Sequence, residues 1–158
     1  MSESLNPIGY AGSGVPSHHH YRWAATLAAN PERYGITLLR LVIGIVFLVH
    51  GAQKWFIYGP AGTVAALGQL GIPAIGAYAA MTAEFLCGIL LIIGLFTRFA
   101  VVPLMGVMLG ALFSVHIRNG FFIQSGGFEY VLTLLAGLVA LLLAGPGTLA
   151  VDDVIAAP

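Results

Sequence analysis

Histidine and glutamate side chains occur inside stretches of this chain that are otherwise almost entirely apolar. His50 closes the run GIVFLVH, and His116 closes the similar run GALFSVH. Glu84 lies within MTAEFLCG, and Glu129 opens an apolar segment in EYVLTLL. Imidazoles and carboxylates exchange protons and form hydrogen bonds, so these four residues are the candidate catalytic groups of one polar pocket.

Two basic residues accompany this group in the first apolar segment. Arg40 is expected to pair with Glu84, unless Glu84 is a protonated hydrogen-bond donor, because an unpaired carboxylate is costly in hydrocarbon. Arg40 and Lys54 join the two histidines as candidate cofactor-binding residues. Lys54 has a simpler interpretation, because a basic residue near the end of a membrane helix often extends to the interface.

Histidines and carboxylates on neighbouring helices suit three kinds of ligand, and the spacing does not decide among them. A quinone carbonyl could accept a hydrogen bond from His50 or His116 while Glu84 or Glu129 exchanges a proton. Both imidazoles could instead ligate a b-type haem. Two histidines and a carboxylate could also bind a transition metal, but no metal-binding motif is present and we predict no metal site.

The composition places these residues in a membrane. Of the 158 residues, 59% are hydrophobic and 8% are charged, whereas soluble domains carry about 25% charged residues. Six basic and six acidic residues give a formal net charge of zero, which argues against nucleic-acid binding. The single cysteine, Cys87, allows no intrachain disulfide. The lipid bilayer is therefore the expected surrounding of this chain.

Four apolar segments approach the length of about 20 residues that a helix needs to cross a bilayer. They cover about residues 34–56, 73–96, 98–119 and 128–145. The linker 57–73 is too polar and glycine-rich to span, and it predicts a short interfacial helix at 63–70. The sequence thus predicts an all-α, integral membrane four-helix bundle with up-down-up-down topology at 34–158, after an extramembrane tail at 1–33.

Glycines and a weak internal repeat bear on how these helices pack. Residues 44–50 and 110–116 share Gly, Phe, Val and His at matching offsets, which would put the two histidines at one depth on diagonally opposed helices. Gly106 and Gly110 form a small-xxx-small pair. We expect these two glycines, like Gly44, Gly51 and Gly88, to allow close approach of helix backbones.

An ordered set of short motifs runs along the chain. It comprises Arg40 with Gly44 and Phe47, HGAQK at residues 50–54, LGIP, Glu84 with Gly88, LLIIGLFTR at residues 90–98, GFEY, and a closing GPG before Asp152. This set, over about residues 36–153, resembles the DoxX family of small four-helix membrane proteins, which are also grouped with the DoxD-like subunit of thiosulfate:quinone oxidoreductase. The resemblance places Arg40, Lys54, Glu84 and Arg98 on the recurrent charged positions of that family.

The resemblance implies a bacterial inner-membrane protein that works as an oxidoreductase component with quinone or with soluble redox partners. Two functions stay open. The chain is either a membrane subunit associated with redox chemistry, or a non-catalytic accessory subunit that stabilises a larger energy-converting assembly. Whether it is itself an enzyme is left open. Residues 1–33 are expected to contact partner subunits, and the distribution of basic residues predicts cytoplasmic termini for a multi-pass protein.

Overall fold

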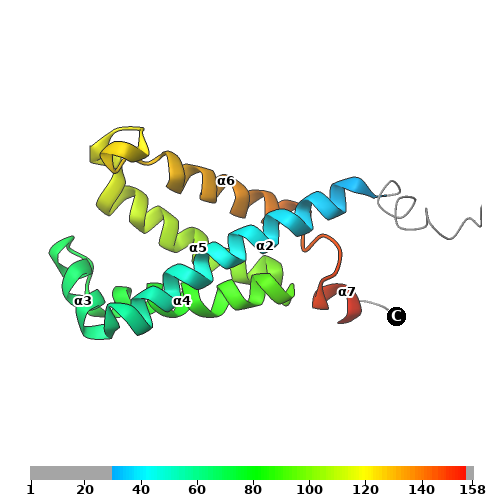
Figure 1. Ribbon diagram of the computed structural model, residues 1–158, viewed down its shortest axis with the longest axis horizontal. Helices are drawn as coiled ribbons and strands as arrows, with labels where there is room; N and C mark the ends of the chain where they lie inside the picture. The colour runs from blue at the N-terminus through cyan, green and yellow to red at the C-terminus, as the bar shows by residue number, and fades with distance from the viewer. Residues whose placement is uncertain (1–29, 156–158) are drawn as a thin grey trace, which may run out of the picture. The chain divides into compact units, whose positions relative to one another are not determined.

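The described part of the chain, residues 30–155 of a computed structural model, is helical and contains no strand (Figure 1). Among these residues, the first helix, α2 (Pro31–Ala52), begins three residues before the expected start. Most of the predicted extramembrane tail lies outside the described residues, and so does the partner contact expected of it. That contact stays a prediction.

Four long helices form the body of this part. They are α2 (Pro31–Ala52), α4 (Ala74–Ile93), α5 (Thr97–Ala111) and α6 (Glu129–Ala144). Two π-helical segments, η2 (Gln53–Ile57) and η3 (Leu112–His116), continue α2 and α5. The shorter elements are α3 (Gly59–Gln69), η4 (Ile117–Asn119), η5 (Ile123–Ser125) and α7 (Val151–Ile155). A helix therefore occupies the linker in which a short one was predicted.

Three of these helical stretches are long and apolar enough to cross a membrane. They are Pro31–Ile57, Ala74–Ile93 and Thr97–Asn119, while Glu129–Ala144 is apolar but shorter. Large apolar side chains such as Ile75, Phe99 and Leu143 are more than 70% exposed, as expected for surfaces that face lipid rather than water. The prediction of an all-α integral membrane protein is confirmed.

Each long helix packs against two others. Helix α2 contacts α4 and α6, and α5 contacts the same two helices, so α2 and α5 are diagonal neighbours. Figure 1 shows α2 and α4 running side by side, with α5 and α6 beside them. A buried apolar cluster fills the middle. Its most completely buried side chains are Phe47, Leu91, Val101, Leu104, Leu138 and Leu141.

Glycines set the close contact between α2 and α4. A Cβ atom added at Gly51 would lie 2.5 Å from the backbone nitrogen of Phe85, and one at Gly88 would lie 2.6 Å from that of Leu48. The predicted packing role of these glycines is confirmed. The same prediction for Gly106 and Gly110 is wrong, because a Cβ at either position meets nothing within 4 Å.

A C-terminal strap, residues 145–155, closes one end of the helices. The Asp152 carboxylate accepts hydrogen bonds from the backbone nitrogens of Phe96 (2.7 Å) and Thr97 (3.0 Å), the latter being the first residue of α5. The backbone nitrogen of Asp152 donates to the Gly94 carbonyl, and Arg33 pairs with Asp153. Asp152 thus supplies the cap that α5 lacks in its own sequence.

Candidate functional site

A polar cavity of about 230 Å³ lies among α2, α4, α5, α6 and the two π-helical segments. It is lined by Val46, Phe47, His50, Lys54, Glu84, Met108, His116, Tyr130 and Leu134. Three of the four predicted catalytic candidates, His50, Glu84 and His116, therefore share one cavity. The two histidines lie on diagonally opposed helices, as expected, and their common depth stays a prediction.

The π-helical segments place two of the polar side chains. Lys54 lies in η2 and His116 closes η3, each just beyond the end of a regular α-helix. A π-helical turn carries an extra residue, so it rotates the residues after it relative to the preceding helix face. Such turns are frequent at functional sites, and here both occur next to the same cavity.

Both histidine rings are held by backbone carbonyls. Nδ1 of His50 donates to the Val46 carbonyl at 2.8 Å, and Nδ1 of His116 donates to the Gly126 carbonyl at 2.7 Å. A neutral imidazole has one N–H, so this bond assigns the proton to Nδ1 and leaves Nε2 as an acceptor. Each neutral ring therefore offers a free hydrogen-bond acceptor.

Glu84 is paired, but not with the predicted partner. Its Oε2 accepts a hydrogen bond from Nζ of Lys54, and the side chain of Glu84 is only 4% exposed. Lys54 thus points into the protein, contrary to the simpler expectation that it extends to the interface. The interaction joins η2 to the middle of α4.

Arg40 does not reach Glu84, so the predicted pair between them is wrong. The glycine contacts explain why: Gly51 lies against Phe85, whereas Arg40 lies against Gly94. Arg40 is therefore level with the far end of α4, about 16 Å along α2 from Gly51. Its Nη2 donates to the Leu149 carbonyl at 3.2 Å, and Arg40 lines none of the cavities described here.

Glu129 also lies apart from the polar cavity. Its Oε1 accepts a hydrogen bond from the backbone nitrogen of Ile123 at 2.8 Å, which fixes the loop before α6. The next residue, Tyr130, lines the cavity instead. Sequence reasoning missed Tyr130, although it follows Glu129 in the same motif. Of these two neighbouring residues in the first turn of α6, only Tyr130 lines the cavity.

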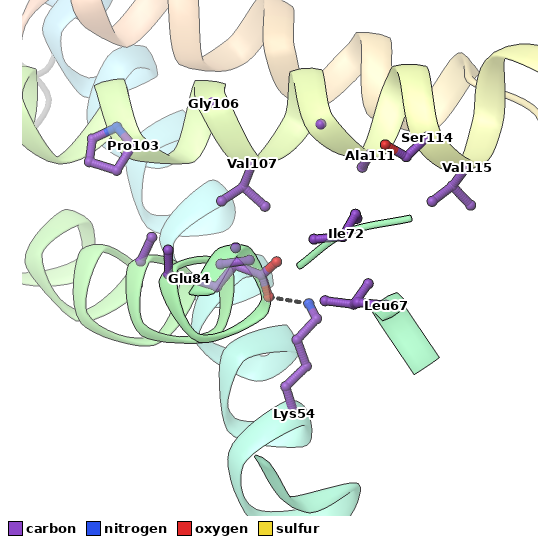
Figure 2. A pocket seen from close by; sticks show the side chains of 15 residues that line it. Lys54, Leu67, Ile72, Glu84, Pro103, Gly106, Val107, Ala111, Ser114 and Val115 are labelled. Atoms are coloured by element: carbon purple, nitrogen blue, oxygen red, sulfur yellow. Dashed lines mark hydrogen bonds and ion pairs between the residues drawn. The ribbon is translucent and has the colours of Figure 1, made fainter. Parts of the chain in front are cut away.

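A second, apolar cleft of about 480 Å³ lies between α4 and α5. Its lining is mostly small or apolar and includes Ala80, Pro103, Gly106, Val107 and Gly110. Leu67 and Ile72 approach it from α3 and the following loop (Figure 2). Lys54 and Glu84 line both this apolar cleft and the polar cavity, so the ion pair forms a wall that the two spaces share.

The residues fit the three candidate ligands unequally. A porphyrin is at least as large as the drug-sized ligands that take cavities of about 300 Å³ or more, so a haem does not fit the polar cavity. Across residues 30–155, no three His, Cys, Asp or Glu side chains are grouped to hold a metal ion. The polar cavity is smaller than the cavities that drug-sized ligands take, and its polar lining residues are His50, Lys54, Glu84, His116 and Tyr130.

Fold and cavity together define an integral membrane protein whose described part is helical, with a polar site lined by side chains from its long helices. The DoxX family model matches residues 35–117, which is more than half of the chain. The chain belongs to the DoxX family. The sequence-based prediction of this family is thus confirmed.

Relatives in three bacteria extend this result. "Uncharacterized membrane protein Rv3486" of Mycobacterium tuberculosis is 35% identical over 92% of this chain and 92% of its own length. "Putative oxidoreductase CatD" of Bacillus subtilis is 35% identical over 75% of this chain and 84% of its own. An uncharacterized protein of Haemophilus influenzae is 32% identical over 76% and 90%. No solved structure matches.

Proposed function

We propose that this DoxX-family protein is a redox-associated subunit of the bacterial inner membrane that binds a hydroquinone or quinone ring in the polar cavity. One observation carries the proposal: both histidines line the polar cavity, and each donates Nδ1–H to a backbone carbonyl, which leaves its Nε2 free to accept a hydrogen bond. Two acceptor nitrogens match the two hydroxyl groups of a hydroquinone.

The other polar groups of the cavity complement this arrangement. Tyr130 brings a hydroxyl that both donates and accepts, and Glu84 brings a buried carboxylate held by Lys54. A bound hydroquinone supplies two electrons and two protons. Nε2 of His50 and of His116 would accept hydrogen bonds from its hydroxyls and take up the protons. The electrons would pass to a membrane or soluble redox partner. The name of the Bacillus subtilis relative, an oxidoreductase, supports this class of chemistry.

The proposal includes the topology in which the cavity operates. Helices α2, α4, α5 and α6 would cross the bilayer up-down-up-down, with α3 at the interface and both termini in the cytoplasm. The 16-residue α6 is about 24 Å long, so its ends must be completed by flanking residues or by local thinning of the bilayer. The polar cavity would then lie in the outer half of the membrane.

Binding of a tail-less hydroquinone to the purified protein tests the proposal. We expect binding by the wild type and a loss of about fivefold to tenfold in affinity for His116→Phe, because one hydrogen bond to the ring is removed. Phe113→Leu is the matched control, since Phe113 lies in the same π-helical segment but is 63% exposed. Wild-type affinity in His50→Phe, His116→Phe and Glu84→Gln alike would contradict it.

A further inference from the structure

The apolar cleft between α4 and α5 is open space rather than a packed helix contact. Gly106 and Gly110 line it, yet a Cβ at either position would meet no atom within 4 Å. Along α5 the cleft extends from Pro103 to Val115, which is about 18 Å of helix. One leaflet of a bilayer core is about 15 Å thick. The cleft therefore has room for part of a lipid chain.

A polar atom of Glu84 faces this apolar space. Oε2 of Glu84 is bonded to Lys54, but Oε1 accepts no hydrogen bond from any residue in the range 30–155. Figure 2 shows this second oxygen directed away from Lys54 and into the cleft. A carboxylate oxygen accepts hydrogen bonds, so a molecule in the cleft that carries an O–H or N–H group can donate one to Oε1.

The charge of the site limits what that donor can be. Lys54 and Glu84 neutralise each other, and no further charged side chain lines the apolar cleft. An anionic headgroup would face the Glu84 carboxylate, and a cationic one would compete with Lys54. A neutral head group with a hydroxyl can donate a hydrogen bond to Oε1 without bringing an unpaired charge into the site.

We propose that the apolar cleft binds the chain of a neutral, hydroxyl-bearing lipid whose head lies at Lys54 and Glu84, and that this lipid is an alkylated hydroquinone. The identity of the head rests on the proposed function, whereas the binding of the chain does not. The polar cavity holds only a ring. The shared wall allows the ring to occupy the polar cavity while its chain lies in the cleft.

Photolabelling of the full chain in lipid nanodiscs tests the chain site. The probe is a long-chain alcohol with a diazirine near its middle, and the labelled positions are found by peptide mass spectrometry. We expect labelling on the cleft face of α5, at Val107, Ala111 or Ser114. The double variant Gly106→Leu/Gly110→Leu fills the cleft, so labelling there should fall by about tenfold or more.

Three controls separate a blocked cleft from a damaged fold. Gly35→Leu adds the same side chain at an exposed helical glycine with nothing within 4 Å, and it should label as the wild type does. Ala80→Phe fills the cleft from α4 instead, so it should lose labelling by an independent route. Each variant is accepted only with a thermal unfolding midpoint close to that of the wild type.

Competition identifies the head. Decyl-hydroquinone should suppress the labelling, whereas tail-less hydroquinone at the same concentration should not. If neither competes but the glycine variants still abolish labelling, the cleft takes another neutral lipid and the hydroquinone assignment fails. If labelling persists in the glycine variants and in Ala80→Phe, the chain site itself is overturned. Loss of ring binding in His116→Phe with intact alcohol labelling supports both sites separately.

Discussion

Lys54 and Glu84 form an ion pair at the centre of the proposed site, in surroundings that are otherwise apolar. Removal of one partner would leave the other charge unpaired and poorly solvated, which is far more costly than removal of both. We expect Lys54→Met and Glu84→Leu each to lower the free energy of unfolding by about 2–3 kcal/mol. Lys54 is 21% exposed, so the loss should stay below that of a fully buried pair.

The double variant Lys54→Met/Glu84→Leu checks this account. It should lose less stability than either single variant, because no unpaired charge remains. The measurement is a double-mutant cycle of unfolding free energies, obtained by titrating mixed micelles with a denaturing detergent. Additive losses would show that the two side chains do not interact.

The residues of the site were predictable by type but not by pairing. An ionisable residue within an apolar helix is a functional candidate because its side chain is costly to place in a bilayer. This reasoning identified His50, Glu84 and His116. Pairing depends on the register between helices, and here glycine contacts fix that register: Gly51 brings Glu84 level with Lys54 and leaves Arg40 at the far end. The sequence contains no direct signal for this offset.

Element packing makes a matched pair of predictions about glycines. Gly51→Ala would place a methyl group 2.5 Å from the Phe85 backbone and push α2 away from α4, so we expect a loss of about 1–3 kcal/mol. Gly106→Ala has open space around it and removes the backbone freedom of glycine. It should stabilise the protein by about 0.5–1 kcal/mol. Thermal unfolding in detergent compares the stabilities of the two alanine variants. Equal changes in stability would contradict the assigned packing.

The C-terminal strap makes a further prediction for α5. Asp152→Ala removes the acceptor for the backbone nitrogens of Phe96 and Thr97, so we expect a loss of about 1 kcal/mol in stability. Asp152→Asn keeps a side-chain oxygen and should recover most of it. We expect the thermal unfolding midpoint to fall for Asp152→Ala but not for Asp152→Asn. An unchanged midpoint in Asp152→Ala would mean that the strap does not cap α5.

The π-helical segments show a limit of sequence-based prediction at the scale of elements. Hydropathy located the helices to within a few residues, and the linker helix was expected from its position. Nothing in the sequence indicated that the helix would widen at Gln53–Ile57 and Leu112–His116. These two segments set the directions of the Lys54 and His116 side chains. The sequence therefore predicted a shared pocket but not the full set of side chains that line it.

For the whole molecule, the proposed topology predicts which loops are reachable from each side of the membrane. A cysteine-free background with Cys87→Ser accepts single cysteines at Gln69, the last residue of α3, or at Val154, in the strap. With cytoplasmic termini, an impermeant thiol reagent should label Gln69→Cys in intact spheroplasts. It should label Val154→Cys only after permeabilisation. The reverse labelling pattern would show that the termini lie on the outer side of the membrane and would contradict the proposed topology.

The most direct test of the account is the state of the two histidine rings when a ring ligand binds. Nitrogen-15 NMR of the histidine-labelled protein reports Nδ1 and Nε2 separately, and His50→Gln and His116→Gln assign their signals among the five histidines. On addition of tail-less hydroquinone, we predict shifts of Nε2 in both rings while Nδ1 stays protonated on its carbonyl partner. Unchanged signals from both rings at saturating hydroquinone would contradict the proposed site.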